Sequence, residues 1–264
     1  MKREIAVIGM IACIAVGLVI GFFIPGLLAP TEGKPLLNKI KDRGYFIVGT
    51  SADYPPFENV SYPSAEIVGF DIDIAEMIAD EIGVNLEMTD IGFDSLIGAC
   101  RAGTIDMIAA AMTYTTDREK QLAASVTYIT VRQVVVVKSD SVLTDIDELE
   151  DLIGQDVGCQ GGTVMEEELV NATITPTAYD RVDLLLQDLY LGAIDAAYID
   201  GPIFDAYQVL FDLKIIFSSD PEPLSLWCRK YEPELMHVIN EVILEAFQDG
   251  TMLELWDKWF NATG

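Results

Sequence analysis

Apolar and polar positions alternate along this chain in two ways, one typical of helices and the other of buried strands. Residues 71–82 place apolar side chains at positions 72, 74, 75, 78, 79 and 82, the spacing of one helix face, and Gly83 follows. Residues 134–137 are four consecutive valines, which predict a buried strand of high β propensity. The chain is therefore expected to combine amphipathic helices with buried strands.

The same patterns place the remaining elements. Helices are predicted at 36–42, 71–82, 93–101, 145–152, 164–170, 181–191, 233–248 and 252–260. Strands are predicted at 45–50, 84–88, 107–112, 131–137, 156–160, 173–177 and 196–199, with one more at 225–229. Residues 53–57 contain two prolines and predict an irregular loop. Because helices and strands alternate, the predicted fold class is α/β.

One supersecondary unit occurs twice. The segment RAGTIDMIAAA at 101–111 is echoed by YLGAIDAAYID at 190–200, and each follows a helical pattern and enters an apolar strand. Upstream, residues 47–51 and 156–160 each form a strand pattern that ends in a loop of small residues. Parallel-sheet domains bind ligands where the carboxyl ends of strands face a crevice. The repeat therefore predicts two lobes that face each other across a cleft.

Residues 5–29 form an apolar run without a charged side chain, directly after Lys2 and Arg3. The run is long enough for a membrane span of ~20 residues, and the basic residues would keep the N-terminus inside. We therefore expect residues 1–30 to be an N-terminal signal or anchor segment that is retained, with residues 31–264 outside the cytoplasmic membrane. A cleaved signal, which would release a secreted protein, is the main alternative. The remaining chain is divided into lobe 1 at 31–130, lobe 2 at 131–224 and a return to lobe 1 at 225–264.

Composition narrows the function classes. The formal net charge is −27, which argues against binding to nucleic acid or to anionic lipid. The single histidine, His237, lies within a predicted helix far from the loops, so no catalytic triad is expected. No metal-binding motif is found, and neither a metal nor a cofactor is expected.

Glycosylation sequons and the number of cysteines bear on whether the protein is extracellular. The sequons at Asn59, Asn171 and Asn261 together predict an external glycoprotein. Outside the apolar run the cysteines are Cys100, Cys159 and Cys228, which allow at most one disulfide.

Charged and hydroxyl side chains follow the two echoed strands. Arg118 and Thr113 follow the first of them, and a planar guanidinium is the group best suited to a carboxylate. Asp200 ends the matching strand and suits an ammonium group, while Thr163 opens a facing helix. Each residue alone more often has a structural role, as a surface ion pair or a helix cap. Their joint placement at equivalent points of two lobes, with aromatic residues such as Tyr54 nearby, favours a site for a zwitterion.

Several motifs in order carry a family resemblance. They are GTSADYPPFE at 49–58, GFDID at 69–73, FDSLI at 93–97, the Thr-x-Thr-x-x-Arg pattern at 113–118, VGCQGGT at 157–163, IDAAYID at 194–200 and DGT at 249–251. Over about residues 38–260 the chain resembles the polar amino-acid-binding proteins of ABC importers, the family 3 extracellular solute-binding proteins. The resemblance implies a two-lobed periplasmic-binding fold of type II, with two parallel-core sheets joined by two crossover strands. It also implies a small-molecule amino-acid ligand and an ABC permease in the membrane as partner.

The resemblance assigns roles to most of the site. Arg118 would bind the α-carboxylate, helped by Thr113 and Thr163, and Asp200 would bind the α-ammonium group. Tyr54 would lie on one side of the ligand side chain.

The other residues implied by the resemblance shape the walls of the cleft. Phe93 would lie on the second side of the ligand side chain, Ala111 would offer backbone groups, and Gln160 would line the cleft. Several members that bind basic amino acids or glutamine carry Asp where this chain has Ser51, which we include as a site residue. The difference favours a polar or neutral amino acid.

Two other functions stay open. Similar chains include cyclohexadienyl dehydratases, and an enzyme of that kind would need a general acid in the cleft. The pairing of Arg118 with Asp200 favours an amino acid over a prephenate-type dianion, so we expect no catalysis. A ligand-sensing receptor domain is the third possibility, but few residues precede the apolar run.

Overall fold

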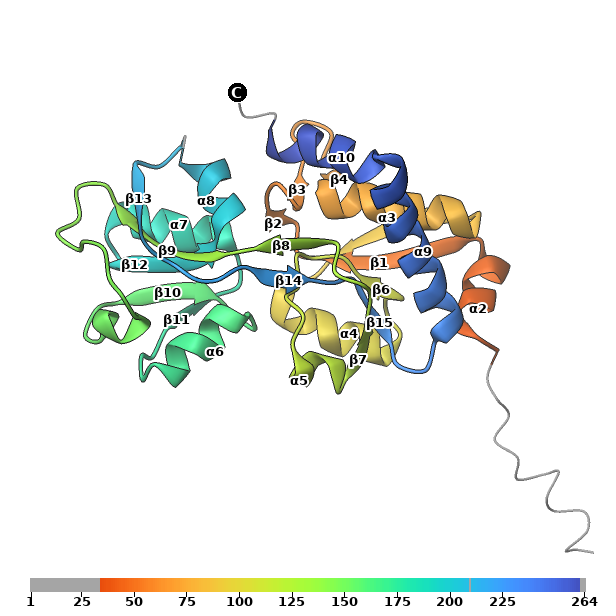
Figure 1. Cartoon of the computed structure of the whole chain (residues 1–264), viewed down its shortest axis with the longest axis horizontal. Helices are drawn as coiled ribbons and strands as arrows, with labels where there is room; N and C mark the ends of the chain where they lie inside the picture. Colours follow the sequence, from red (N-terminus) through yellow and green to blue (C-terminus); the bar gives the residue numbers. More distant parts are fainter. Residues whose placement is uncertain (1–33, 209, 262–264) are drawn as a thin grey trace, which may run out of the picture. The chain divides into compact units, whose positions relative to one another are not determined.

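Two five-stranded sheets organise the computed structural model, which describes residues 34–208 and 210–261 (Figure 1). The first sheet has the order β5 (Asn85–Asp90), β1 (Tyr45–Thr50), β6 (Met107–Ile108), β15 (Trp227–Arg229) and β7 (Leu122–Ala124). The second has the order β11 (Thr177–Tyr179), β10 (Val157–Gln160), β12 (Ala196–Asp200), β9 (Gln133–Lys138) and β13 (Leu213–Ser218). In each, three strands are parallel and the other two are antiparallel to their neighbours.

Two strands connect the sheets. β8 (Ile129–Val131) leads from the first sheet into β9, and β14 (Glu222–Leu224) leads back from β13 into β15. They pair antiparallel to each other and run between the two sheets in Figure 1. The parts built on the two sheets are called the first and second lobe below. Two lobes joined by two crossover strands, with a return to the first sheet, confirm the predicted architecture.

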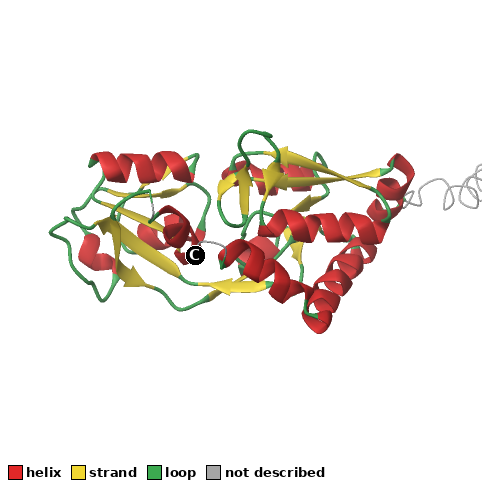
Figure 2. Ribbon diagram, turned by 90° about the horizontal axis from the view of Figure 1, so that it is seen from above, coloured by secondary structure: helices red, strands yellow, loops and turns green. Residues whose placement is uncertain are grey.

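Helices cover both faces of each sheet (Figure 2). In the first lobe one face carries α2 (Leu36–Arg43), α3 (Phe70–Ile82), α9 (Pro233–Asp249) and α10 (Thr251–Phe260). The other face carries α4 (Leu96–Ala102), preceded by the short η1 (Phe93–Ser95), and α5 (Thr116–Glu119) follows β6. In the second lobe α7 (Val182–Leu191) and α8 (Gly201–Tyr207) cover one face, and α6 (Val164–Asn171) and η2 (Leu149–Leu152) cover the other.

Three predicted elements differ from the structure. The helix expected at 145–152 is only the turn η2, because residues 145–151 carry five acidic and no basic side chains, which repel one another along a helix. The strand expected at 173–177 is displaced to β11, because Thr173 has a left-handed φ of 63°. The strand expected at 107–112 ends at Ile108, and Ala111 has a φ of 46°.

The loop expected at 53–57 belongs partly to a small third sheet. Its strands are β2 (Asp53–Tyr54), β3 (Glu58–Val60) and β4 (Ile67–Val68). These pairs hold the residues after β1 against the first lobe, next to the strand ends that face the second lobe.

The three cysteines in the described chain are buried free thiols. Cys100 packs with the α4 face of the first sheet, Cys228 packs with the opposite face, and Cys159 belongs to the core of the second lobe. None of the three forms a disulfide in this structure.

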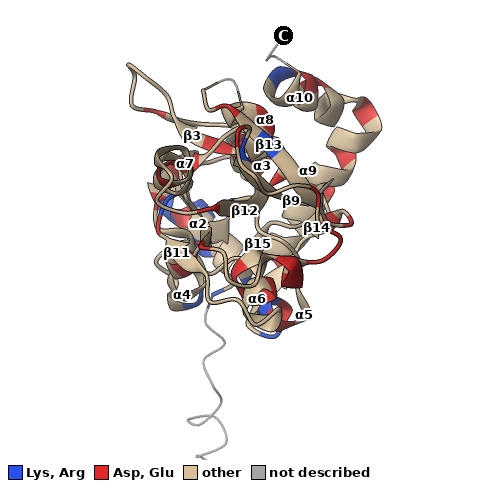
Figure 3. Cartoon of the chain, turned by 90° about the vertical axis from the view of Figure 1, so that its left-hand side faces the viewer, with Lys and Arg blue, Asp and Glu red and all other residues tan. Residues whose placement is uncertain are grey.

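The predicted surface features fall on exposed positions. Asn59, Asn171 and Asn261 are all exposed, and their glycosylation stays a prediction. Figure 3 marks acidic residues on several helices, including α6, α9 and α10. The predicted anchor at 1–30 lies outside the described residues, and within them no helix has both the length and the apolar character of a membrane span.

A close backbone contact fixes the start of α3. Gly69 has a φ of 154°, and a Cβ at this position would overlap the Phe57 carbonyl oxygen and lie 2.8 Å from the Glu58 Cα. The Asp71 N–H donates to the same carbonyl oxygen at 3.0 Å. Only glycine leaves room for this approach, which brings Glu58 and Asp71 onto adjacent backbone segments.

We predict that Gly69→Ala lowers the free energy of unfolding by about 3 kcal/mol, because the new methyl group must displace backbone and φ must change. Gly83→Ala is the control: its φ is 81° and its Cβ would meet nothing within 4 Å. The control should lose only about 1 kcal/mol. Urea unfolding of both variants measures the difference, and equal losses would contradict the contact.

Candidate ligand-binding site

Arg118 is a buried cation whose hydrogen bonds end on carbonyl groups. Its side chain follows the Thr115 cap of α5 and is 7% exposed. One guanidinium nitrogen donates to the Thr113 carbonyl at 2.7 Å, and another donates across the cleft to the Gly162 carbonyl at 3.0 Å. Within the described residues no carboxylate lies within ion-pair distance of it. Burial lowers the pKa of Arg118 to about 10, so the site favours the arrival of an anion.

Asp200 is a buried anion on the second lobe. It ends β12 and is 3% exposed. One carboxylate oxygen accepts from the Tyr54 hydroxyl at 2.7 Å, and the other accepts from the Gln133 amide at 3.3 Å. Burial raises the pKa of Asp200 to about 7, although these hydrogen bonds and the Arg118 charge lower it. A cation placed beside Asp200 would therefore stabilise its charged form.

Eight of the nine predicted site residues line one small cavity between the lobes. They are Tyr54, Phe93, Ala111, Thr113, Arg118, Gln160, Thr163 and Asp200. The cavity has about 10 Å³ of free space, roughly the room for one water molecule. An amino acid is far larger, so the lobes must separate for one to enter.

The backbone and amide groups of the cavity wall differ in what they can offer. The Ala111 N–H already donates to Asp71, which leaves the Ala111 carbonyl. The Thr163 hydroxyl donates to the Gln160 carbonyl at 2.7 Å and caps α6, so it is engaged within the protein. The Gln160 side-chain nitrogen is buried without a partner and is the unused donor in this wall.

Ser51 lies elsewhere. It lines a neighbouring pocket of about 480 Å³ together with Asp90, Gly92, Asp94, Ser95, Asp180 and Arg181. Its hydroxyl donates to Asp53 at 2.9 Å. The pocket beside Ser51 is thus predominantly acidic.

The structure adds cavity residues that the sequence analysis did not name. Ala110, Val164 and Met165 line the cavity, and each is adjacent in sequence to a predicted residue or one position further on. Their closeness in sequence to Ala111 and Thr163 is a signal that could have identified them. Gln133 lies on β9, and no sequence signal connects it with Asp200.

The two lobes also contact each other outside the cavity. Asp53 of the first lobe accepts from the Val182 N–H, at the start of α7 in the second lobe, at 2.6 Å. A carboxylate at a helix N-terminus is a favourable, charge-assisted contact. Asp53 is buried and absent from the cavity lining, so it holds the lobes together from beside the site.

Comparison with known proteins gives a family. The family described as bacterial extracellular solute-binding proteins, family 3, matches residues 46–262. The arginine-binding extracellular protein ArtP of Bacillus subtilis is 32% identical, with 81% of this chain and 86% of ArtP covered. The L-cystine-binding protein TcyJ of Escherichia coli is 30% identical, with 96% and 95% covered.

A solved structure agrees with these relatives. The ancestral amino acid-binding protein AncCDT-1, a precursor of cyclohexadienyl dehydratase, superposes with a TM-score of 0.79 at 32% identity. The match covers 85% of this chain and 99% of that protein.

Proposed function

Because the chain belongs to the bacterial extracellular solute-binding proteins of family 3, we propose that it captures an amino acid for an ABC-type importer. The family places the protein outside the cytoplasm. An ABC permease in the membrane is the partner that would receive the ligand. Residues 1–30 would keep the receptor at the membrane by anchoring it.

This proposal rests on two buried, oppositely charged side chains, Arg118 on the first lobe and Asp200 on the second, which line the same small cavity. Arg118 has no carboxylate partner in the described chain, and Asp200 is an anion that burial makes costly. An α-carboxylate on Arg118 and an α-ammonium group on Asp200 would satisfy both. A zwitterion that contacts both lobes stabilises the closed arrangement, which is the mechanism of domain closure.

The ligand side chain has two candidate classes. Ser51, in place of an acid, favours a polar or neutral side chain. The pocket beside it favours a cationic one, because Asp90, Asp94 and Asp180 line it. Relatives of both kinds exist, since ArtP is named for arginine and TcyJ for cystine.

Catalysis is not part of the proposal. The curated relatives ArtP and TcyJ are binding proteins, and the ancestral structure is described as amino acid-binding although it precedes an enzyme. The charges of Arg118 and Asp200 match an amino acid better than a dianion.

We predict that one or a few amino acids raise the thermal unfolding temperature, because a ligand that binds only the folded state stabilises it. The panel contains the common amino acids, cystine and prephenate. Arg118→Ala should weaken binding at least about 30-fold, since it removes a buried partner of the carboxylate. Arg101→Ala, at an exposed arginine bonded to Gln121, should bind normally. A response to prephenate alone, with turnover, would refute the receptor and favour the enzyme.

Ligand affinity should fall as the pH drops below 7. In the closed arrangement without a cation, burial raises the pKa of Asp200 to about 7, and an ammonium group in the cavity would lower that pKa. Binding therefore releases a proton, and affinity decreases by up to about tenfold per pH unit below 7 and is level above it. Calorimetry in two buffers of different ionisation enthalpy measures the released proton. Asp200→Asn should bind weakly with little dependence on pH, and an unchanged slope in that variant would contradict the assignment.

Asp53→Ala should weaken ligand binding about tenfold, because the closed state loses one charge-assisted hydrogen bond to the start of α7. The control is Asp183→Ala, whose side chain is 44% exposed and pairs with Arg181 nearby. Calorimetric affinities should separate the two variants, with circular dichroism to check that both are folded. Equal affinities would show that the Asp53 contact does not contribute to closure.

A further inference from the structure

Several unpartnered polar atoms lie in the first lobe, and those of Glu58 and Asp71 belong to adjacent backbone segments. Six buried side-chain nitrogen or oxygen atoms in the described chain lack a hydrogen-bond partner, and four of them belong to Thr50, Glu58 and Asp71. None of these side chains is more than 1% exposed. Such atoms are costly in a protein interior, so a concentration of them in one lobe calls for a physical explanation.

Asp71 fixes part of the cavity wall. One of its carboxylate oxygens accepts from the Ala111 N–H at 2.8 Å and from the Tyr128 hydroxyl at 2.9 Å. Ala111 has a left-handed φ of 46°, which a residue with a Cβ adopts only when its surroundings impose it. Asp71 therefore helps to hold the backbone of Ala111, which lines the ligand cavity, in this conformation. Its second oxygen has no partner.

Glu58 is the unusual member of this group. Neither of its carboxyl oxygens has a donor, and the charges that act on it most strongly are those of Asp71, Asp53, Asp200 and Asp90, all acids. Burial and these acids raise the pKa of Glu58 well above its usual value. An ionised carboxylate here would bear its full desolvation cost with nothing to offset it.

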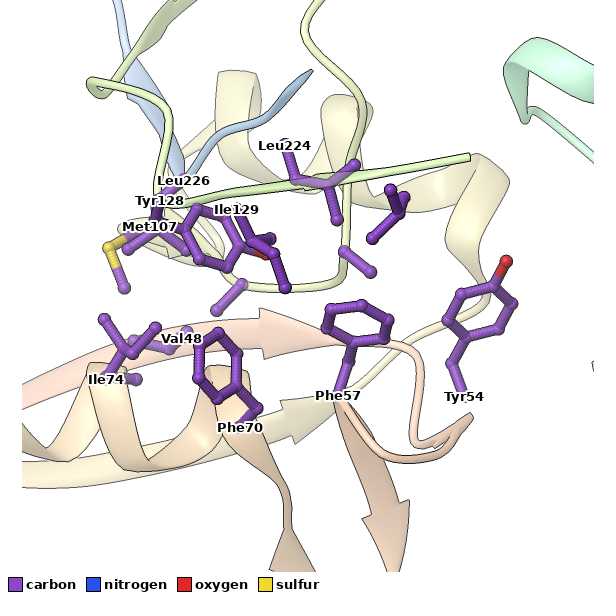
Figure 4. Packing of buried hydrophobic residues seen from close by; sticks show 14 of the residues in the cluster. Val48, Tyr54, Phe57, Phe70, Ile74, Met107, Tyr128, Ile129, Leu224 and Leu226 are labelled. Carbon is purple, nitrogen blue, oxygen red and sulfur yellow. The ribbon is translucent and has the colours of Figure 1, made fainter. Parts of the chain in front are cut away.

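Among the described residues no basic side chain pairs with Glu58 or Asp71, and neither residue is more than 1% exposed to solvent. Figure 4 shows Phe57 and Phe70 projecting toward Tyr128 and Ile129, with Tyr54 alongside. The Phe57 and Phe70 rings are in contact at 6.4 Å, and Phe70 stacks on Tyr128 at 6.1 Å between centroids. Glu58 directly follows Phe57 and Asp71 directly follows Phe70, so both acidic side chains start beside this aromatic layer.

The distribution of donors decides which acid carries the proton. Burial raises the pKa of Asp71 to about 7, and the two hydrogen bonds that it accepts lower that pKa, whereas Glu58 accepts none. The backbone contact at Gly69 holds the two residues on adjacent segments. A protonated Glu58 has an O–H group that can donate a hydrogen bond, and the second oxygen of Asp71 is an acceptor without a partner.

We propose that Glu58 is a neutral carboxylic acid that donates its proton to the free oxygen of Asp71, and that this shared proton fixes the Ala111 wall of the ligand site. Glu58 is thus a positioning residue that acts through Asp71 and Ala111 without touching the ligand. The affinity part rests on the proposed amino-acid binding. The proton itself is a property of the protein alone.

The test compares Glu58→Gln with Glu58→Met. Glutamine keeps a neutral donor for Asp71 and should bind the ligand within about threefold of the parent at pH 7. Methionine has similar size and no donor, so binding should weaken about tenfold, the value of one hydrogen bond, even where thermal stability is kept. A role in packing alone would instead make affinity follow stability in both variants.

Two measurements need no ligand. The infrared difference spectrum between the parent protein and Glu58→Gln at pH 7 should contain the carbonyl band of a protonated acid. A raised folded-state pKa stabilises the protein at low pH, and this contribution is lost as the pH rises through that pKa. The unfolding temperature of the parent should therefore fall relative to Glu58→Gln as the pH rises above 4.5, the ordinary pKa of a glutamate.

The outcomes separate the two proposals. Absence of the acid band, or equally weak binding by the Gln and Met variants, overturns the shared proton. If no amino acid stabilises the parent protein, the proposed function fails, while the band and the pH dependence still decide the state of Glu58. Should Glu58→Gln not fold, Asp71→Asn serves instead: its amide would donate to an ionised Glu58, and the acid band should disappear.

Discussion

The site depends on one constraint: Arg118 is removed from water, and no carboxylate in the described part of the chain lies at ion-pair distance from it. A buried guanidinium that bonds only to carbonyl oxygens is stabilised far less than one paired with an acid. The acid that faces it across the cavity, Asp200, belongs to the other lobe and is itself held by Tyr54 and Gln133. The two charges are therefore available to a third molecule that carries both opposite charges, which is what an amino acid provides.

The architecture puts these groups in place. Asp200 ends β12 and Arg118 follows β6, so each lobe presents a charge near the end of a strand of its sheet. The pair β8 and β14 is the link between the lobes, and Thr113 forms a bridge with Leu224 beside it. A change in the separation of the lobes is thus coupled to the wall that carries Arg118.

The acidic character of the chain has two physical forms. Most of the 43 acidic residues are at the surface, where water keeps them charged. A few are buried in the first lobe around the site, and there burial raises the pKa of Asp53, Glu58 and Asp71. Asp53 offsets its burial by accepting from the start of α7, Asp71 by holding Ala111, and Glu58 by remaining neutral. The three buried acids therefore have different roles, although burial raises the pKa of each of them.

The sequence by itself determined most of the helices and strands, and it named eight residues that line one cavity. Amphipathic spacing gave the helix at 70–82 to within one residue, and β propensity together with the repeat gave β1 and β12. Local signals of this kind depend only on neighbouring residues. Eight of the nine named site residues meet in one cavity because they lie near the ends of elements that the repeat had already identified.

Tertiary structure alone decided the rest. Asp53 and Val182 are separated by 129 positions, so no local pattern links them, and the partnership of Gln133 with Asp200 is equally remote. The early end of β6 follows from the contact between Ala111 and Asp71, and the placement of Ser51 in a separate acidic pocket follows from lobe packing. The charge states of the buried acids also depend on the tertiary structure, because desolvation is set by all the groups that surround a carboxyl group in three dimensions.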